Sequence, residues 1–246
     1  MIFTTDMEDN DSAPLILEII YEDQWLVAVN KPSGIFVHRT KLDPTAKVFV
    51  VQSLRDQIGQ HVHPVHRLDR KTSGVLLLGK TKEAHALLSE QFRERNMEKR
   101  YHAIVRGYTD DAGLIDYDVT NDNGKLQSAQ SAYRCLERVE LAVPFGKHPT
   151  SRYSLVELDP ITGRQHQLRK HMSHIFHPII GDRPHGCNKQ NRFFLEQFDM
   201  SEMLLHAKLL RFKHPYSGAD ILLKASYPPH FLRMLEALSF TRHLEK

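Results

Sequence analysis

Short apolar runs separated by tight turns dominate this chain of 246 residues. Runs rich in Val, Ile, Leu and Tyr predict strands over 15–21, 25–29, 75–78, 100–107, 152–159, 203–212 and 219–225. Neighbouring runs are joined by turns such as Asn30–Gly34 and Lys213–Gly218 rather than by long crossovers. Because short turns join antiparallel strands, the pattern predicts an α+β domain with a mixed, mostly antiparallel sheet flanked by helices and loops, not a doubly wound parallel sheet.

Four segments have the periodicity of helices. Apolar residues recur at three- and four-residue steps in 45–59, 82–96, 162–178 and 229–240. Thr81 is expected to cap the second of these helices, because a Thr oxygen accepts from free N–H groups at a helix N-terminus.

Composition limits the class of protein. The chain is 41% hydrophobic and 26% charged, and it has only two cysteines, Cys135 and Cys187. A disulfide framework is therefore not expected, and neither is a membrane span, since no apolar run approaches 18 residues. The first residues are acidic and lack the basic segment of a signal peptide. We expect a cytoplasmic protein with an acidic, flexible tail over 1–14 and a single domain over 15–246.

Charge is distributed unevenly. Residues 1–30 contain seven of the 30 acidic residues and none of the 33 Lys and Arg residues. Two segments concentrate the basic excess, 61–106 with ten basic against five acidic residues and 161–192 with six against one. A basic face of this kind suits RNA or another polyphosphate, although a solvated surface rich in Lys and Arg would give the same count.

The sequence HRLDRKTSG, residues 66–74, places Asp69 between Arg67 and Arg70. One interpretation is an ion cluster at the surface. The other is a working carboxylate, which could attack a sugar carbon or stabilise positive charge there while arginines bind phosphates. The residues alone leave both open.

Other kinds of site find little support. Neither dinucleotide-binding nor P-loop glycine pattern occurs, so no nucleotide cofactor is expected. His166, His171, His174 and His177 lie close together, but they form no His-Glu-x-x-His motif and basic residues surround them. We predict no metal site, and interpret these histidines as neighbours of phosphate or as surface residues.

Several motifs, taken together and in order, resemble those of the RluA family of pseudouridine synthases. The matching segments are NKPSGIFVH (30–38), HRLDRKTSG (66–74), EKRYHAIVRG (98–107), TGRQHQLRKHM (162–172), HPIIGD (177–182) and LLHAKLLRFKHP (204–215). The resemblance covers about residues 15 to 225. It implies the pseudouridine synthase fold with a central active-site cleft, and isomerisation of uridine to pseudouridine in RNA without a cofactor.

Within this family, residues 47–74 are especially similar to members that modify uridine 65 of transfer RNA. The resemblance therefore implies tRNA as the partner of a monomeric enzyme, without the N-terminal S4-like domain that several relatives carry. A ribosomal RNA synthase of the same family, or a non-catalytic RNA-binding module, is the alternative.

The resemblance also implies roles for individual residues. Asp69 would be the essential carboxylate, and Arg164 would pair with it. Tyr101 would pack on the target base and is a candidate for removing the C5 proton, although a tyrosine with the usual pKa of about 10 is a poor base.

Four more residues would contact substrate. Leu168 would form an apolar wall of the uracil pocket, and Arg67 would fill the gap left by a flipped-out uridine. His66 and Arg70 would contact the RNA backbone. Each also has a structural interpretation, as a core residue or a surface cation.

Overall fold

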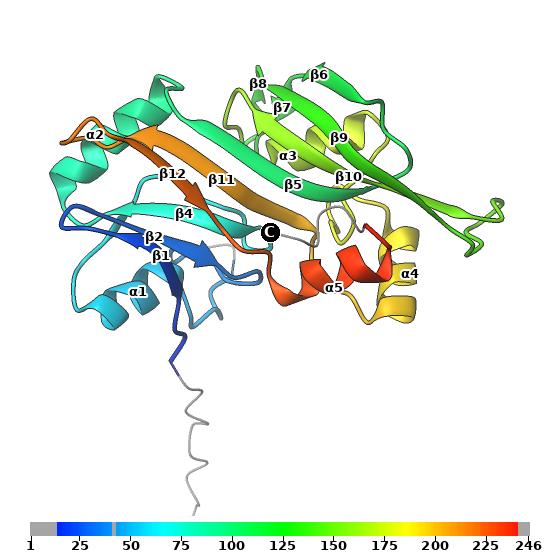
Figure 1. The fold of residues 1–246 in the computed structure, drawn as a ribbon, viewed down its shortest axis with the longest axis horizontal. Helices are drawn as coiled ribbons and strands as arrows, with labels where there is room; N and C mark the ends of the chain where they lie inside the picture. The colour runs from blue at the N-terminus through cyan, green and yellow to red at the C-terminus, as the bar shows by residue number, and fades with distance from the viewer. Residues whose placement is uncertain (1–13, 41–42, 241–246) are drawn as a thin grey trace, which may run out of the picture.

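The computed structural model describes residues 14–40 and 43–240. The acidic tail expected over 1–14 therefore lies outside the described residues except for Pro14. One sheet of ten strands forms the centre of the molecule (Figure 1). Its main path runs β1-β2-β4-β11-β5-β10-β9-β6, with β12 paired to β11 and β3 paired to β4. The strands are β1 (Glu18–Glu22), β2 (Leu26–Lys31), β3 (His63–Pro64), β4 (Ser73–Gly79), β5 (Glu98–Arg106), β6 (Ala112–Asp116), β9 (Gln130–Leu141), β10 (Ser151–Pro160), β11 (Leu205–Lys213) and β12 (Asp220–Lys224).

The sheet is mixed and mostly antiparallel, as the sequence predicts. The parallel pair is β4 with β11, where Gly74 lies opposite Ala207. Gly74 has φ +110°, and a Cβ there would lie 2.2 Å from the carbonyl oxygen of Ala207, so this position needs glycine. Beside it, the Ser73 hydroxyl and His206 Nδ1 are 2.9 Å apart, a buried bond between the same two strands. The Thr-Ser-Gly end of the motif is thus built into the sheet.

Helices cover both faces of the sheet. On one face, α1 (Val50–Ile58) packs Val50 and Leu54 over β2 and β4, and α3 (Gln167–His174) packs Leu168 and Met172 over β5 and β10. On the other, α2 (Lys82–Arg93) covers β2 and β4, while α4 (Asn188–Phe198) and α5 (Pro229–Ala237) cover β5 and β10. Tyr101 packs against the α1 and the α3 core, so it marks the seam between them.

The helix predictions hold with one clear exception. The Thr81 hydroxyl accepts a hydrogen bond from the Ala84 N–H and caps α2. The helix expected over 162–178 is much shorter, because the Gln167 side chain organises a turn before it. Its Oε1 accepts from the Thr162 hydroxyl and the Arg164 N–H, and α3 begins only after this turn.

Several elements were not expected from the sequence. The longest are the half-exposed strand β9, whose charged residues obscure its alternation, and α4; the shorter strands β3 and β6 were not expected either. A separate two-stranded hairpin, β7 (Val119–Thr120) and β8 (Leu126–Gln127), lies beside α3 in Figure 1. None of the described helices is long and apolar enough to cross a membrane.

Candidate active site

A cavity of about 610 Å³ opens at the seam marked by Tyr101. Its walls come from the motif loop 65–72, from β5, from the N-terminal end of α3 and from the turn between β7 and β8. The volume is in the range of small-molecule sites and admits a nucleotide. We call it the main cavity. Six of the predicted site residues line it: Asp69, Tyr101, Leu168, Arg164, His66 and Arg67. His166, which was not predicted as a site residue, lines it as well.

Asp69 lies on the loop between β3 and β4, and its side chain is 23% exposed. Its Oδ2 accepts a hydrogen bond of 2.8 Å from Nη1 of Arg169 on α3. The same guanidinium donates from Nε and Nη2 to both oxygens of Asp182, each at 2.8 Å. Burial opposes the charge on Arg169, but the two carboxylates raise the pKa of its guanidinium, so it stays a cation. Asp182 thereby fixes Arg169, and Arg169 fixes Asp69.

The expected pairing of Arg164 with Asp69 is wrong. Arg164 lines the main cavity, but its Nε donates to the carbonyl oxygen of Ser128 at 3.0 Å. The reason is the late start of α3, which leaves Arg164 on the preceding turn and places Arg169 on the buried side of the helix. The partner of Asp69 does come from the motif 162–172, one hundred residues away in the sequence.

Tyr101 and Leu168 both line the main cavity, on its apolar side. Tyr101 projects from β5, and Leu168, only 8% exposed, faces it from α3 within the same core. Burial and the neighbouring charge of Asp69 raise the pKa of Tyr101, so the phenolate that could accept a proton is even less populated at neutral pH. The pair forms a flat apolar surface beside the carboxylate.

The other three residues expected to contact the substrate, His66, Arg67 and Arg70, lie in different surroundings. His66 accepts a hydrogen bond from the Leu77 N–H at Nε2 and stacks on Phe92, and burial lowers its pKa to about 3. A neutral ring in these bonds stabilises the motif loop. Arg70 instead lies beside a second cavity of about 330 Å³, and Arg67 borders both cavities. Arg67 is exposed and makes no hydrogen bond or ion pair with any described residue.

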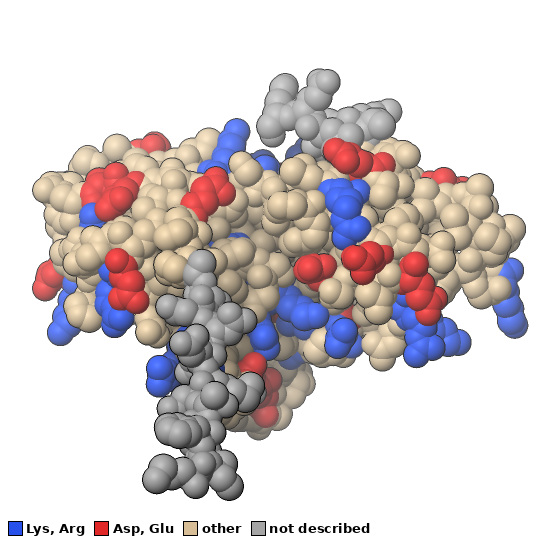
Figure 2. All heavy atoms as spheres, turned by 90° about the horizontal axis from the view of Figure 1, so that it is seen from below, with Lys and Arg blue, Asp and Glu red and all other residues tan. Residues whose placement is uncertain are grey.

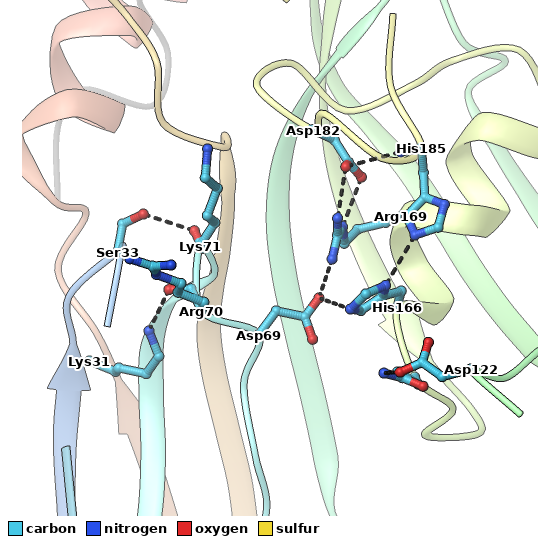
Figure 3. A network of polar contacts seen from close by, with 11 residues as sticks. Lys31, Ser33, Asp69, Arg70, Lys71, Asp122, His166, Arg169, Asp182 and His185 are labelled. Atoms are coloured by element: carbon cyan, nitrogen blue, oxygen red, sulfur yellow. Dashed lines mark hydrogen bonds and ion pairs between the residues drawn. The ribbon is translucent and has the colours of Figure 1, made fainter. Parts of the chain in front are cut away.

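Lys31 and Ser33 bond to the backbone of the motif loop (Figure 3). The Lys31 ammonium is fully buried and donates to the carbonyl oxygens of Pro32 at 2.7 Å and Arg70 at 3.1 Å. The Ser33 hydroxyl donates to the carbonyl oxygen of Lys71. Figure 3 shows the Asp69 side chain pointing away from these residues and toward Arg169. The carboxylate therefore points away from Arg70 and Lys71, two of its neighbours in the sequence.

Sequence reasoning missed Arg169, Asp182 and the pair His166 and His185. A signal for the first two was present, because Asp182 is the only acidic residue between 161 and 192 and stands among six basic ones. An isolated acid in a basic segment indicates a paired one. The contact of His166 with His185 had no such signal, since it depends on how the turn after α3 folds back.

Basic side chains also extend over the surface. In Figure 2 most of the visible Lys and Arg side chains lie in the lower half of the view, with acidic side chains between them. Near the site, the second cavity is bordered by cationic side chains, those of Arg67, Arg70, Lys71 and Arg183. Among the described residues, no cluster of three or more His, Cys, Asp or Glu side chains is arranged to hold a metal ion. A carboxylate fixed by arginine, an apolar wall and a cationic border together define an enzyme site for a phosphate-bearing substrate.

Comparison with known proteins identifies the family. Residues 25–174 match the family model described as RNA pseudouridylate synthase, so the chain belongs to this family. It is 48% identical over 231 residues to a Salmonella typhi protein named tRNA pseudouridine synthase C, covering 89% of each chain. A Vibrio parahaemolyticus protein of the same name is 45% identical over 245 residues, covering 95% of this chain and all of the relative.

Solved structures of RNA pseudouridylate synthase domains have the same fold as this chain. The human RNA pseudouridylate synthase domain containing 4 superposes with a TM-score of 0.71 at 26% identity, covering 90% of this chain and 93% of that one. The human RNA pseudouridylate synthase domain containing 1 has a TM-score of 0.69 at 24% identity, covering 92% and 96%, and shows the shared fold. The fold and the family expected from the motifs are confirmed.

Proposed function

We propose that this protein isomerises uridine to pseudouridine in transfer RNA, at uridine 65, and that Asp69 is the essential carboxylate. The observation that carries the proposal is the fixed carboxylate of Asp69, bonded to Arg169 at the seam of the main cavity. The tRNA substrate is supported by the relatives that bear the name tRNA pseudouridine synthase C. We further propose that residues 15–246 act as one catalytic domain, as a monomer in the cytoplasm.

The reaction sets what the site has to do. The C1′–N1 bond breaks, the uracil turns, and C5 bonds to C1′; the proton leaves C5, and N1 ends up protonated. The isomerisation is redox-neutral, and the proposed chemistry uses side chains alone. Asp69 either bonds to the substrate or stabilises positive charge developing on the sugar, and both routes require a charged carboxylate aimed into the cavity.

The surrounding residues supply binding and orientation. Tyr101 and Leu168 would hold the uracil ring by apolar contact while it turns. Arg67 is free of other partners among the described residues, so it could enter the stack that the flipped uridine leaves, at a flipping cost of a few kcal/mol. Arg70, Lys71 and Arg183 border the second cavity, where the RNA backbone would pass. Arg164, bonded to Ser128, would contact RNA rather than Asp69.

Replacing Asp69 tests the proposed chemistry. We expect Asp69→Ala to abolish tritium release from tRNA labelled at C5 of uridine, while its Kd for tRNA stays within about threefold of the wild type, because phosphate contacts dominate affinity. Asp220→Ala is the matched control, since Asp220 is exposed on β12, pairs with Lys213 and does not line the main cavity. Turnover retained by Asp69→Ala would refute the mechanism.

Mapping pseudouridine in RNA from a deletion strain tests the substrate. We expect loss of the modification at position 65 of tRNA, with ribosomal RNA unchanged. Loss at a ribosomal site with position 65 intact would instead support a ribosomal RNA synthase. If no site is lost and the purified protein binds RNA without turnover, the protein is a non-catalytic RNA-binding module.

A further inference from the structure

A chain of contacts runs from the buried Asp182 through His185 and His166 to the carboxylate of Asp69 (Figure 3). His166 Nδ1 lies 3.0 Å from His185 Nε2, and His166 Nε2 lies 3.8 Å from Asp69 Oδ2. His185 is held in turn by its backbone N–H, which donates to Asp182 Oδ1. Asp69 is therefore approached on the same oxygen by two residues, Arg169 and His166.

The backbone at His166 indicates that its side chain has a specific task. The residue has φ 53°, a left-handed conformation that residues other than glycine rarely adopt. It occupies the N-cap position of α3, yet its side chain makes no capping hydrogen bond. The helix gains nothing from the ring, and what the conformation achieves is to place the imidazole between Asp69 and His185. Backbone strain of this kind clusters at functional sites.

The charges around the two rings determine which nitrogen carries each proton. Burial lowers the pKa of both histidines, so near neutral pH each ring is uncharged and has one N–H donor and one acceptor. A lone pair on His166 Nε2 would face the negative Asp69 carboxylate, which is unfavourable. The favoured arrangement puts the proton on His166 Nε2, so that its Nδ1 accepts from the Nε2–H of His185.

We propose that His166, oriented by His185, is a positioning residue for Asp69: its Nε2–H donates to Oδ2 beside Arg169 and leaves Oδ1 free to react. This inference rests on the proposed function for the role of Asp69. The distance of 3.8 Å is longer than a hydrogen bond. Catalytic contacts of this length tighten when the substrate fills the site.

Other charged groups also face the two rings. His166 is influenced by groups from the motif loop, from α3 and from the turn between β7 and β8, namely Asp69, Arg169, Lys170 and Asp122. His185 is influenced by Asp182, Arg169 and Lys170 in addition to His166. Acidic and cationic side chains both surround the two rings, so their charges partly cancel. The tautomer of His166 therefore depends on which atoms face its two nitrogens.

Nitrogen NMR of the histidine rings tests the arrangement directly and needs no turnover. In the wild-type protein near pH 7.5 we expect His166 as the Nε2–H tautomer. In His185→Phe, which removes the donor to Nδ1, we expect a mixture of tautomers, and His185→Gln should restore the wild-type spectrum because its amide can donate. A wild-type His166 ring protonated on Nδ1 would overturn the proposal.

Kinetics test the consequence for Asp69. We expect His166→Phe to lower kcat for tRNA by about 10- to 100-fold, the loss typical of a misplaced reacting group, with KM within about threefold. His166→Gln keeps a donor and carries the same backbone strain, so it should recover most of kcat. The control is His174→Gln, an exposed residue on the same helix that stacks on Tyr117.

The outcomes separate the two proposals. Equal kcat values for His166→Phe and His166→Gln, or a loss confined to KM, would refute positioning while leaving the synthase activity standing. A wild-type protein without turnover on any RNA would refute the proposed function, and the tautomer of His166 would still decide the contact with Asp69. Thermal unfolding of both variants shows whether a loss of kcat comes from loss of fold.

Discussion

Two walls meet at Asp69, and the buried cation of each wall is bonded differently. In the loop wall, formed by residues 30–34 and 65–72, the buried Lys31 donates to the carbonyl oxygens of Pro32 and Arg70. The exposed Arg70 donates to the carbonyl oxygen of Gly34 and to the Asp43 carboxylate. In the helix wall, formed by α3 and the turn at 181–187, Arg169 donates only to the carboxylates of Asp69 and Asp182.

The difference teaches what each wall contributes. Cations bonded to carbonyl oxygens hold the shape of a loop, so removing one should lower stability more than chemistry. A cation between two carboxylates fixes their positions and balances their charge, so removing it should lower both the stability of the protein and its kcat. The following changes test this contrast, from the largest expected effect to the smallest.

Arg169→Met breaks the helix wall. It leaves Asp69 and the buried Asp182 without their cation, and such a loss typically costs about 3 to 5 kcal/mol of stability. We also expect kcat to fall by about 100-fold or more, because the carboxylate loses its orientation. Urea denaturation and tritium release measure the two effects. Arg164→Met serves as comparison and should lose at most about 10-fold in kcat; an equal loss in both variants would restore Arg164 as a partner of Asp69.

Gly74→Ala strains β4, the strand that directly follows the loop wall. The added Cβ would meet the backbone of Ala207 at 2.2 Å in a left-handed conformation, so we expect a loss of about 3 kcal/mol or more in the free energy of unfolding. Gly218 also has a positive φ, +69°, but no atom lies within 4 Å of an added Cβ, so Gly218→Ala should lose only about 1 to 2 kcal/mol. Similar losses in both variants would mean that the conformation, not the contact of β4 with β11, requires glycine.

Lys31→Met tests the loop wall through pH. Burial lowers the pKa of Lys31 to about 7 in the folded protein, against about 10.4 for an exposed lysine. Between these values the unfolded chain binds more protons than the folded one, so stability contributed at this site rises with pH. We expect the wild type to gain about 1 to 2 kcal/mol over Lys31→Met between pH 7 and pH 9.

Urea denaturation at three pH values measures this difference, because other titrating groups cancel when the variant is subtracted. Lys224→Met, which removes an exposed lysine of β12, should show no such trend. A flat difference for Lys31→Met would mean that its ammonium stays charged in the folded state throughout this range.

Thr81→Ala lies outside both walls and should have the smallest effect. It removes the cap of α2 and is expected to cost about 1 kcal/mol of stability. Turnover per folded molecule should stay unchanged, and Thr81→Ser should keep full stability because serine also caps. A clear loss of kcat in Thr81→Ala would show that turnover also depends on α2, which belongs to neither wall.

Much of the fold was predictable because its signals are local. Thr81 caps its helix through a residue three positions on, and the short turns specify a mostly antiparallel sheet. The six motifs, taken together and in order, were sufficient to predict the family and to make Asp69 the candidate for the reactive carboxylate. The predictions failed where the sequence pattern was weaker. Charged residues obscure the alternation of apolar and polar side chains in β9, and the helix predicted from residue 162 begins at Gln167.

The partners of Asp69 were decided by the tertiary structure. The family resemblance of the sequence placed the carboxylate in the motif loop and named Arg164, in the motif 162–172, as its partner. The structure has Arg169 in that place, because a turn made by the side chain of Gln167 delays the start of α3. Nor could the sequence place His166 against His185 or predict that Asp69 points away from Arg70 and Lys71. Those contacts join segments distant in sequence, and only the packing of α3 against the sheet brings them within bonding distance.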